Sequence, residues 1–442
     1  MHSNPVPDSS NSIADLYLVP RLIVGILGII DTLLIFKITE RRYCQTIAFF
    51  AAILFAIMPF SWMTRRILLE TIQLPFMLTS ILLILNIDIQ RAVKLQIIIS
   101  GLFMGLAIFT KIPAFTFIPL AVFMIYFNSR QLKYVGLWLI PAILIPALWP
   151  IHATVTGDMN DWISGVIYQT NRSAKPLISA LYDFFVIDPV LLVLGIAGLI
   201  FAAIKKDIFL ILLSMPTVVF FYLIDYVASF HLILLLPSLC IAAGYLLTAM
   251  GQIIMRKIKM KVNVKVKGGQ FIPAIAVSVF GIIITGQLIS LDMNSNYYDT
   301  LSFVLGQLPD NILSDAGAAN KSSITVSNDE YSNNDRLTLV SSAEYFWIPE
   351  LVFNKTLYAH SYYSHNNLKS DRFIVIADDG FLAILNSANL TQAPKLSAAF
   401  NSTHSLAKFD RKALDQIPLN RYPYNSLNLE PLSKIIDVRA NY

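Results

Sequence analysis

The sequence predicts an all-α polytopic membrane bundle of about ten transmembrane helices, followed by a small mixed α/β extracytoplasmic domain. Of the 442 residues, 56% are hydrophobic and only 14% are charged, whereas an average soluble domain carries roughly 25% charge. The mean hydropathy is +0.62. A change of character near residue 291 marks the end of the membrane part, because apolar runs give way there to polar sequence with strand-like segments.

The helices of the bundle are predicted from apolar runs, each close to the length of about 17 to 25 residues that a membrane crossing needs. Two runs that meet at Thr110-Lys111-Ile112-Pro113 are short, and a tight hairpin that does not fully span is an alternative interpretation for them. The runs cover residues 17–36, 45–62, 70–87, 95–110, 112–128, 135–151, 184–204, 208–224, 231–250 and 271–291.

The orientation of the bundle follows from its basic loops, which concentrate Lys and Arg on alternate connections and so mark the cytoplasmic side. The strongest of them is RKIKMKVNVKVK, residues 256–267. We therefore expect an outward N-terminal tail over residues 1–16, a transmembrane domain over 17–291 and an extracytoplasmic domain over 292–442. Asp31, in the first run, lies near the cytoplasmic end and is expected to point toward water.

The C-terminal domain is predicted to contain short strands in SSITVSN, RLTLVSS and DRFIVIADD, which combine β-branched residues with flanking polar residues. SSAEYFWIPELVF, residues 341–353, gathers aromatic side chains around Pro349. This segment is interpreted as core, with contact to an acceptor as the alternative.

Several classes of site are not predicted. The two cysteines, Cys44 and Cys240, form neither a disulfide framework nor a metal-ligand spacing. The chain has no nucleotide-binding glycine loop. We expect no metal, no cofactor and no nucleic acid partner.

Charged residues at the predicted outer face are the candidate site. WMTRRILLETIQLPF, residues 62–76, places Arg65, Arg66 and Glu70 between two apolar runs, where charge is costly. Lys111 in IFTKIPAF and His231 at the start of a late apolar run fall on the same side. Arginine binds phosphate through a planar fork and lysine as a point charge.

Simpler explanations stand beside this one. Arg65 and Arg66 could anchor the chain at lipid headgroups, and Glu70 could form a helical ion pair with Arg66, four residues earlier. His231 could be a satisfied interfacial histidine. The predicted outer loop 152–183 adds His152, Asp158, Asp161 and Trp162, with Asp225 near the later run. That loop could hold a surface helix with Trp162, Ile163, Val166 and Ile167 on one side.

Four stretches resemble the GT-C superfamily of membrane glycosyltransferases, in particular the dolichyl-phosphate-mannose protein mannosyltransferases and the aminoarabinose transferases of lipid A. They carry, in the family's order, Arg21 in its "aRl" position, an arginine and an acid five residues apart (Arg65 and Glu70), Lys111 and His231. Together they cover roughly residues 17 to 250. The stretches are VPRLIVGILGIIDTLLIFKITERRY, MPFSWMTRRILLETIQLPF, GLFMGLAIFTKIPAF and FHLILLLPSLCIAAGYLL.

The resemblance implies an inverting sugar transfer. A base deprotonates the acceptor hydroxyl, and the lipid phosphate of a polyprenyl-phosphate sugar, often dolichyl-phosphate mannose, leaves while cations stabilise its charge. Arg65 and Lys111 would bind that phosphate, with Arg66 and His231 in the same substrate-binding set, and Glu70 would position the acceptor or the sugar. The implied partners are this donor, a protein or glycan acceptor and membrane lipid. Some members of the superfamily use a divalent ion.

The chain departs from the family pattern at its start. The family places an acidic base in a first outer loop ahead of the "aRl" helix, but here only 20 residues precede Arg21. Asp8 and Asp15 are the acids available there, and Asp15 is too close to the helix. We expect a chain that lacks the leading helix and loop and, with them, the family's base, so that it is either inactive or relies on another acid. Glu70 and Asp158 are weak substitutes.

Two other classes therefore stay open. A non-catalytic membrane subunit or receptor would need no base. A transporter or lipid flippase would place ionisable groups near the bilayer midplane, often in broken helices, and the predicted runs carry few such groups.

Overall fold

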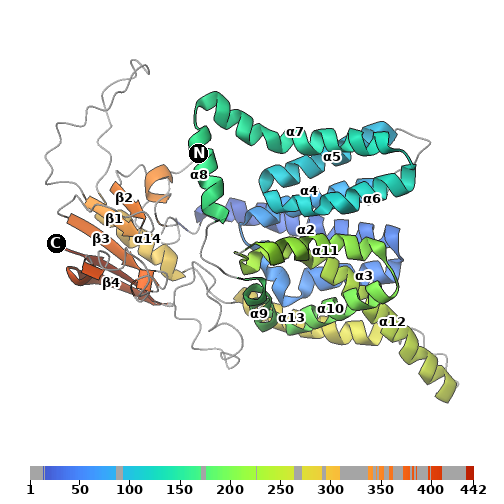
Figure 1. Ribbon diagram of the computed structural model, residues 1–442. Coiled ribbons are helices and arrows are strands. Elements are labelled where there is room, and N and C mark those ends of the chain that lie inside the picture. The colour runs from blue at the N-terminus through green and yellow to red at the C-terminus, as the bar shows by residue number, and fades with distance from the viewer. Residues whose placement is uncertain are drawn as a thin grey trace, which may run out of the picture. The chain divides into compact units, whose positions relative to one another are not determined.

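The computed structural model consists of two compact units, Pro20–Ser290 and the combination of Met1–Val19 with Leu291–Tyr442. The first unit is helical and the second contains a β-sheet (Figure 1). The described residues are 13, 15–85, 93–170, 176–224, 226–262, 271–290 and 295–308, and then 337–341, 345, 348–352, 358–361, 372–378, 381–382, 385, 397–398, 400–410 and 435–442.

Helices occupy every run that the sequence predicted to cross the membrane. Among the described residues four helices are long and apolar enough to do so, or five if α3 and η1, bent by 70°, form one broken span. The predicted membrane bundle with a small mixed domain after it is confirmed. The helices are α2 (Leu18–Arg42), α3 (Gln45–Ile57), α4 (Leu69–Leu85), α5 (Val93–Thr110), α6 (Ile118–Ser129), α7 (Leu132–Thr156), α8 (Met159–Thr170), α9 (Leu177–Ile187), α10 (Pro189–Ile204), α11 (Ile208–Leu223), α12 (Leu236–Val262) and α13 (Ile272–Ser290).

The predicted run 184–204 is not continuous. It breaks at Asp188, where α9 ends and α10 begins, because a residue before proline is disfavoured in the helical conformation. The Asp188 carboxylate accepts hydrogen bonds from the amides of Leu191 at 2.9 Å and Phe60 at 3.2 Å. This side chain therefore caps α10 and also fixes the segment that follows α3.

Glycines let the helices of the bundle approach closely. A Cβ atom on Gly101 of α5 would lie 2.4 Å from the carbonyl oxygen of Trp138 on α7, and one on Gly198 of α10 would lie 2.3 Å from that of Ala242 on α12. Such contacts allow backbone-to-backbone packing, which is a common way for membrane helices to associate.

Three short 3₁₀ helices connect the spans, and all of them pack against α4. η1 (Pro59–Arg65) joins α3 to α4, η2 (Ile112–Phe117) joins α5 to α6, and η3 (Ser229–Leu235) leads into α12. Prolines in the first two residues of η1 and η2 suit such starts, because proline needs no amide partner there. Arg65, Lys111 and His231 lie in or directly beside these connections.

The second unit is built on a five-stranded mixed sheet of order β2-β1-β3-β5-β4. β1 pairs in parallel with β2 and β3, whereas β5 runs antiparallel to β3 and β4. The strands predicted in RLTLVSS and DRFIVIADD are present as β1 and β3. The third predicted segment, SSITVSN, lies outside the described residues. Strands β2, β4 and β5 were not predicted from the sequence. The elements are α14 (Ser295–Gln307), β1 (Leu337–Ser341), η7 (Ile348–Val352), β2 (Tyr358–Ser361), β3 (Arg372–Ala377), β4 (His404–Asp410) and β5 (Ile435–Ala440).

The core of this unit includes the N-terminal segment. Ile13 is fully buried in it, and Tyr17 packs there against Tyr298, with its hydroxyl 3.3 Å from that of Tyr297. Tyr345 and Ile348 are buried in the same core, which confirms the core interpretation for that part of SSAEYFWIPELVF.

Candidate functional site

The centre of the candidate site is an ion pair between Glu70 and Lys111. Glu70 lies in the first turn of α4 and is 1% exposed. Lys111 has an extended backbone between α5 and η2, because Pro113 follows it and cannot continue a helix. Its Nζ donates a hydrogen bond to Glu70 Oε1. A buried carboxylate is therefore neutralised by a cation from a different pair of helices.

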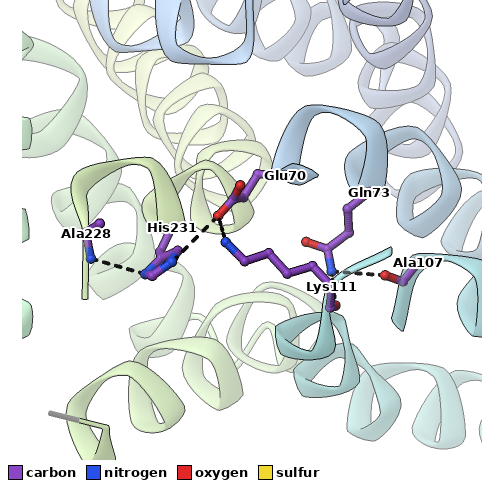
Figure 2. A network of polar contacts seen from close by, with 6 residues as sticks. All are labelled: Glu70, Gln73, Ala107, Lys111, Ala228 and His231. Carbon is purple, nitrogen blue, oxygen red and sulfur yellow. Dashed lines mark hydrogen bonds and ion pairs between the residues drawn. The ribbon is translucent and has the colours of Figure 1, made fainter. Parts of the chain in front are cut away.

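His231 completes this group at the same carboxylate oxygen of Glu70 that Lys111 contacts (Figure 2). Its Nδ1 accepts a hydrogen bond from the backbone amide of Ala228 at 3.1 Å. A ring nitrogen that accepts carries no proton, so in the neutral imidazole the proton is on Nε2. That nitrogen lies 3.7 Å from Glu70 Oε1. We refer to Glu70, Lys111 and His231 as the Glu70 cluster.

The first turn of η3 supplies further contacts that the sequence analysis missed. The Phe230 ring centroid lies 5.0 Å from Lys111 Nζ, a cation–π distance. Ser229 Oγ donates to Asp183 Oδ2 at 2.6 Å. Three consecutive residues thus contact Asp183, Lys111 and Glu70 in turn, although no local pattern in SFH indicates these partners.

The structure places Arg65 and Arg66 beside the junction of η1 with α4. Arg65 is exposed, and its guanidinium donates to the carbonyl oxygen of Ala56 at 2.7 Å, which covers a free carbonyl at the end of α3. The Arg66 guanidinium lies 5.6 Å from the Trp62 ring, and burial lowers its pKa from the ordinary value. Arg66 precedes α4 and so does not share a helix with Glu70. The Glu70 carboxylate contacts Lys111.

Comparison with known proteins places this arrangement in a known fold. Residues 14–152 match the family described as dolichyl-phosphate-mannose-protein mannosyltransferase. The oligosaccharyltransferase of Archaeoglobus fulgidus, solved with a tethered acceptor peptide containing the NVT sequon, superposes with a TM-score of 0.54 at 12% identity, over 88% of this chain and 61% of that one. The chain has the GT-C fold of membrane glycosyltransferases.

A second structure from the same organism, with ligands bound, also has this fold. AglB from Archaeoglobus fulgidus, in complex with an inhibitory peptide and a dolichol-phosphate, gives a TM-score of 0.53 at 13% identity and covers 87% of this GT-C chain. The GT-C chain spans 61% of the length of these two proteins. None of the curated proteins matches it significantly in sequence.

The remaining predicted site residues lie apart from the Glu70 cluster. Asp158 and Asp161 are exposed at the start of α8, and His152 is exposed on α7; no described contact joins them to the cluster. The loop predicted at 152–183 contains a helix, α8, on which Ile163, Val166 and Ile167 are exposed; its position along the membrane surface stays a prediction. Asp225 lies outside the described residues. Within the described part of the chain, no three His, Cys, Asp or Glu side chains form a group that could hold a metal ion.

Proposed function

We propose that this chain transfers a sugar from a polyprenyl-phosphate donor to a protein or glycan acceptor at the outer membrane face. The observation that carries the proposal is the convergence of Glu70, Lys111 and His231, which come from three separate stretches, into one cluster. The description of the family that matches residues 14–152 supports dolichyl phosphate as the carrier and mannose as the sugar. The dolichol-phosphate bound to AglB supports a lipid-phosphate donor.

Lys111 is proposed as the ligand of the donor phosphate. An ammonium group has three hydrogen-bond donors, and Glu70 Oε1 takes one of them. The Lys111 side chain keeps 22% of its surface exposed, so the other donors can reach a phosphate oxygen. Charge that grows on the lipid phosphate as it leaves would be stabilised by a cation already held in place.

Glu70 would then position Lys111 and an acceptor or sugar hydroxyl, while His231 would supply an Nε2–H donor beside them. Arg65 uses one guanidinium N–H on Ala56, and an arginine has five in all. Because Arg65 is exposed, its remaining N–H donors are accessible to a phosphate. Arg66 would add positive charge at the same junction.

We further propose that the second unit is extracytoplasmic. Ile13 and Tyr17, just ahead of α2, pack in the core of this unit. The chain passes from this unit into α2 and returns to it after α13. The basic loops lie on the alternate connections, which favours the outer side for this unit.

The proposal is tested by measuring donor binding and transfer separately, since binding needs only the phosphate ligands whereas transfer also needs a base. The full chain is reconstituted in liposomes with dolichyl-phosphate mannose and a Ser/Thr-containing peptide. Lys111→Met is expected to weaken donor binding at least tenfold. Lys133→Met, at an exposed lysine that begins α7, is the matched control and is expected to bind normally. Equal binding by wild type and Lys111→Met would overturn the phosphate assignment.

A further inference from the structure

The Gln73 side chain lies one turn after Glu70 on α4 and is fully buried. Its Nε2 donates two hydrogen bonds, to the carbonyl oxygen of Ala107 at 3.1 Å and to that of Lys111. Because carbonyl oxygens can only accept, the two partners fix which end of the amide carries the nitrogen.

These two bonds hold the backbone on both sides of Lys111. The amide of Lys111 itself donates to Ala107 O at 3.1 Å, and its carbonyl accepts from Ala114 at 3.3 Å. Gln73 thus reinforces the last turn of α5 and the first turn of η2 at once. The extended residue between these two helices is fixed by a side chain from a third helix.

Residues three apart on a helix share a face, so Glu70 and Gln73 both point from α4 toward Lys111. Glu70 holds the ammonium group and Gln73 holds the backbone carbonyl of the same residue (Figure 2). A long lysine side chain that is fixed only at its head could still move with its backbone. Fixing it at both ends confines Nζ to one position.

The other end of the Gln73 amide argues against a purely packing role. Gln73 Oε1 is buried and has no hydrogen-bond partner in the described structure. A buried acceptor left unpaired is unfavourable, and an apolar side chain of the same length would avoid this cost. The amide is thus useful at this position for the two bonds that its nitrogen makes.

We infer that Gln73 is a positioning residue, which sets the place of the Lys111 ammonium for the donor phosphate; this inference rests on the proposed function. Gln73→Met keeps the length of the side chain and removes both donors. Gln96→Met is the matched control, because Gln96 of α5 also donates to a carbonyl of the partner helix, that of Leu83 on α4, at 2.7 Å. Both glutamines link α4 to α5. Gln96 makes its contact near the C-terminal end of α4, whereas Gln73 lies near the N-terminal end of that helix.

Two readouts separate the inference from the function on which it rests. Acylation of Lys111 by a water-soluble amine-reactive ester, followed by mass spectrometry of the folded full chain, needs no donor. It is expected to become several-fold faster in Gln73→Met and to stay unchanged in Gln96→Met. Gln73→Leu, which also lacks both donors and adds no charge, is expected to behave like Gln73→Met and serves if that variant does not fold.

The second readout is transfer from dolichyl-phosphate mannose. A misplaced group in a substrate site can cost about 100-fold in rate, so kcat/KM for the donor is expected to fall roughly 10- to 100-fold in Gln73→Met, with weaker donor binding as part of that loss. In a Lys111→Met background the same change is expected to have no further effect. Wild-type acylation rates in both Gln73 variants, or equal losses in the Gln73 and Gln96 variants, would overturn the inference. A wild-type chain that neither binds nor transfers the donor would instead overturn the proposed function.

Discussion

Removing the Lys111 ammonium is expected to destabilise the chain more than removing the Glu70 carboxylate, because the two side chains differ in burial. The Glu70 side chain is 2% exposed and that of Lys111 is 22% exposed. Lys111→Met leaves a buried carboxylate without its cation, which costs about 3–5 kcal/mol. His231 Nε2 remains 3.7 Å from the same oxygen, so the lower end of that range is expected.

Glu70→Gln has the smaller expected cost, about 1–2 kcal/mol, because the flexible stem of Lys111 can turn its charge toward water. The double variant Glu70→Gln/Lys111→Met contains neither charge. It is expected to be more stable than Lys111→Met alone, since no buried ion is left unpaired.

Thermal unfolding of the detergent-solubilised full chain measures these differences, with Lys133→Met as the control for removing a lysine from the surface. The expected order of stability is wild type above Glu70→Gln, with Lys111→Met lowest and the double variant above it. Equal losses for the two single variants, or a double variant that shows the sum of both losses, would refute the burial argument.

Four further substitutions have expected outcomes that the same unfolding measurement or the transfer assay can check. Gly198→Ala brings a methyl group against the Ala242 carbonyl and should lower the free energy of unfolding by about 1–3 kcal/mol. Gly28→Ala meets no atom within 4 Å and should be neutral or stabilising by up to about 1 kcal/mol. A larger loss of stability in Gly28→Ala than in Gly198→Ala would contradict the packing at Gly198. Asp31→Leu removes a fully buried carboxylate whose two oxygens have no partner in the described structure, and it should raise the unfolding temperature. A clear decrease in the unfolding temperature would show that the Asp31 carboxylate stabilises the fold. Arg65→Ala should lower transfer while leaving the chain folded, and unchanged turnover would remove Arg65 from the phosphate site.

The sequence predicted the helical architecture well, because its signals are local. Apolar run lengths gave the spans, and Pro113 after Lys111 marked the break between α5 and η2. The break at Asp188 also had a local signal in Asp-Pro, but the continuous apolar composition around it favoured one long run. Strands β4 and β5 lie in segments of mixed polarity, where the alternation is weak.

The contacts within the site could not be predicted in the same way. Glu70, Lys111 and His231 lie far apart in the sequence, and their pairing depends on how η1, η2 and η3 pack against α4. The family resemblance placed these residues in one site but did not say that Glu70 holds Lys111. Asp31 was expected to face water, yet it is fully buried, because the buried face of α2 is set by its packing. No sequence pattern singled out Gln73, because one amide side chain in the segment Thr71-Ile72-Gln73-Leu74 does not indicate which backbone groups it contacts.

The proposed function depends on phosphate binding by Lys111. A cryo-electron microscopy structure of the full chain in lipid nanodiscs, with dolichyl phosphate added, would show whether this binding occurs. We expect a phosphate oxygen within hydrogen-bond distance of Lys111 Nζ while Glu70 still contacts that nitrogen. A lipid phosphate bound elsewhere on the bundle, with Lys111 still in contact only with Glu70, would contradict it.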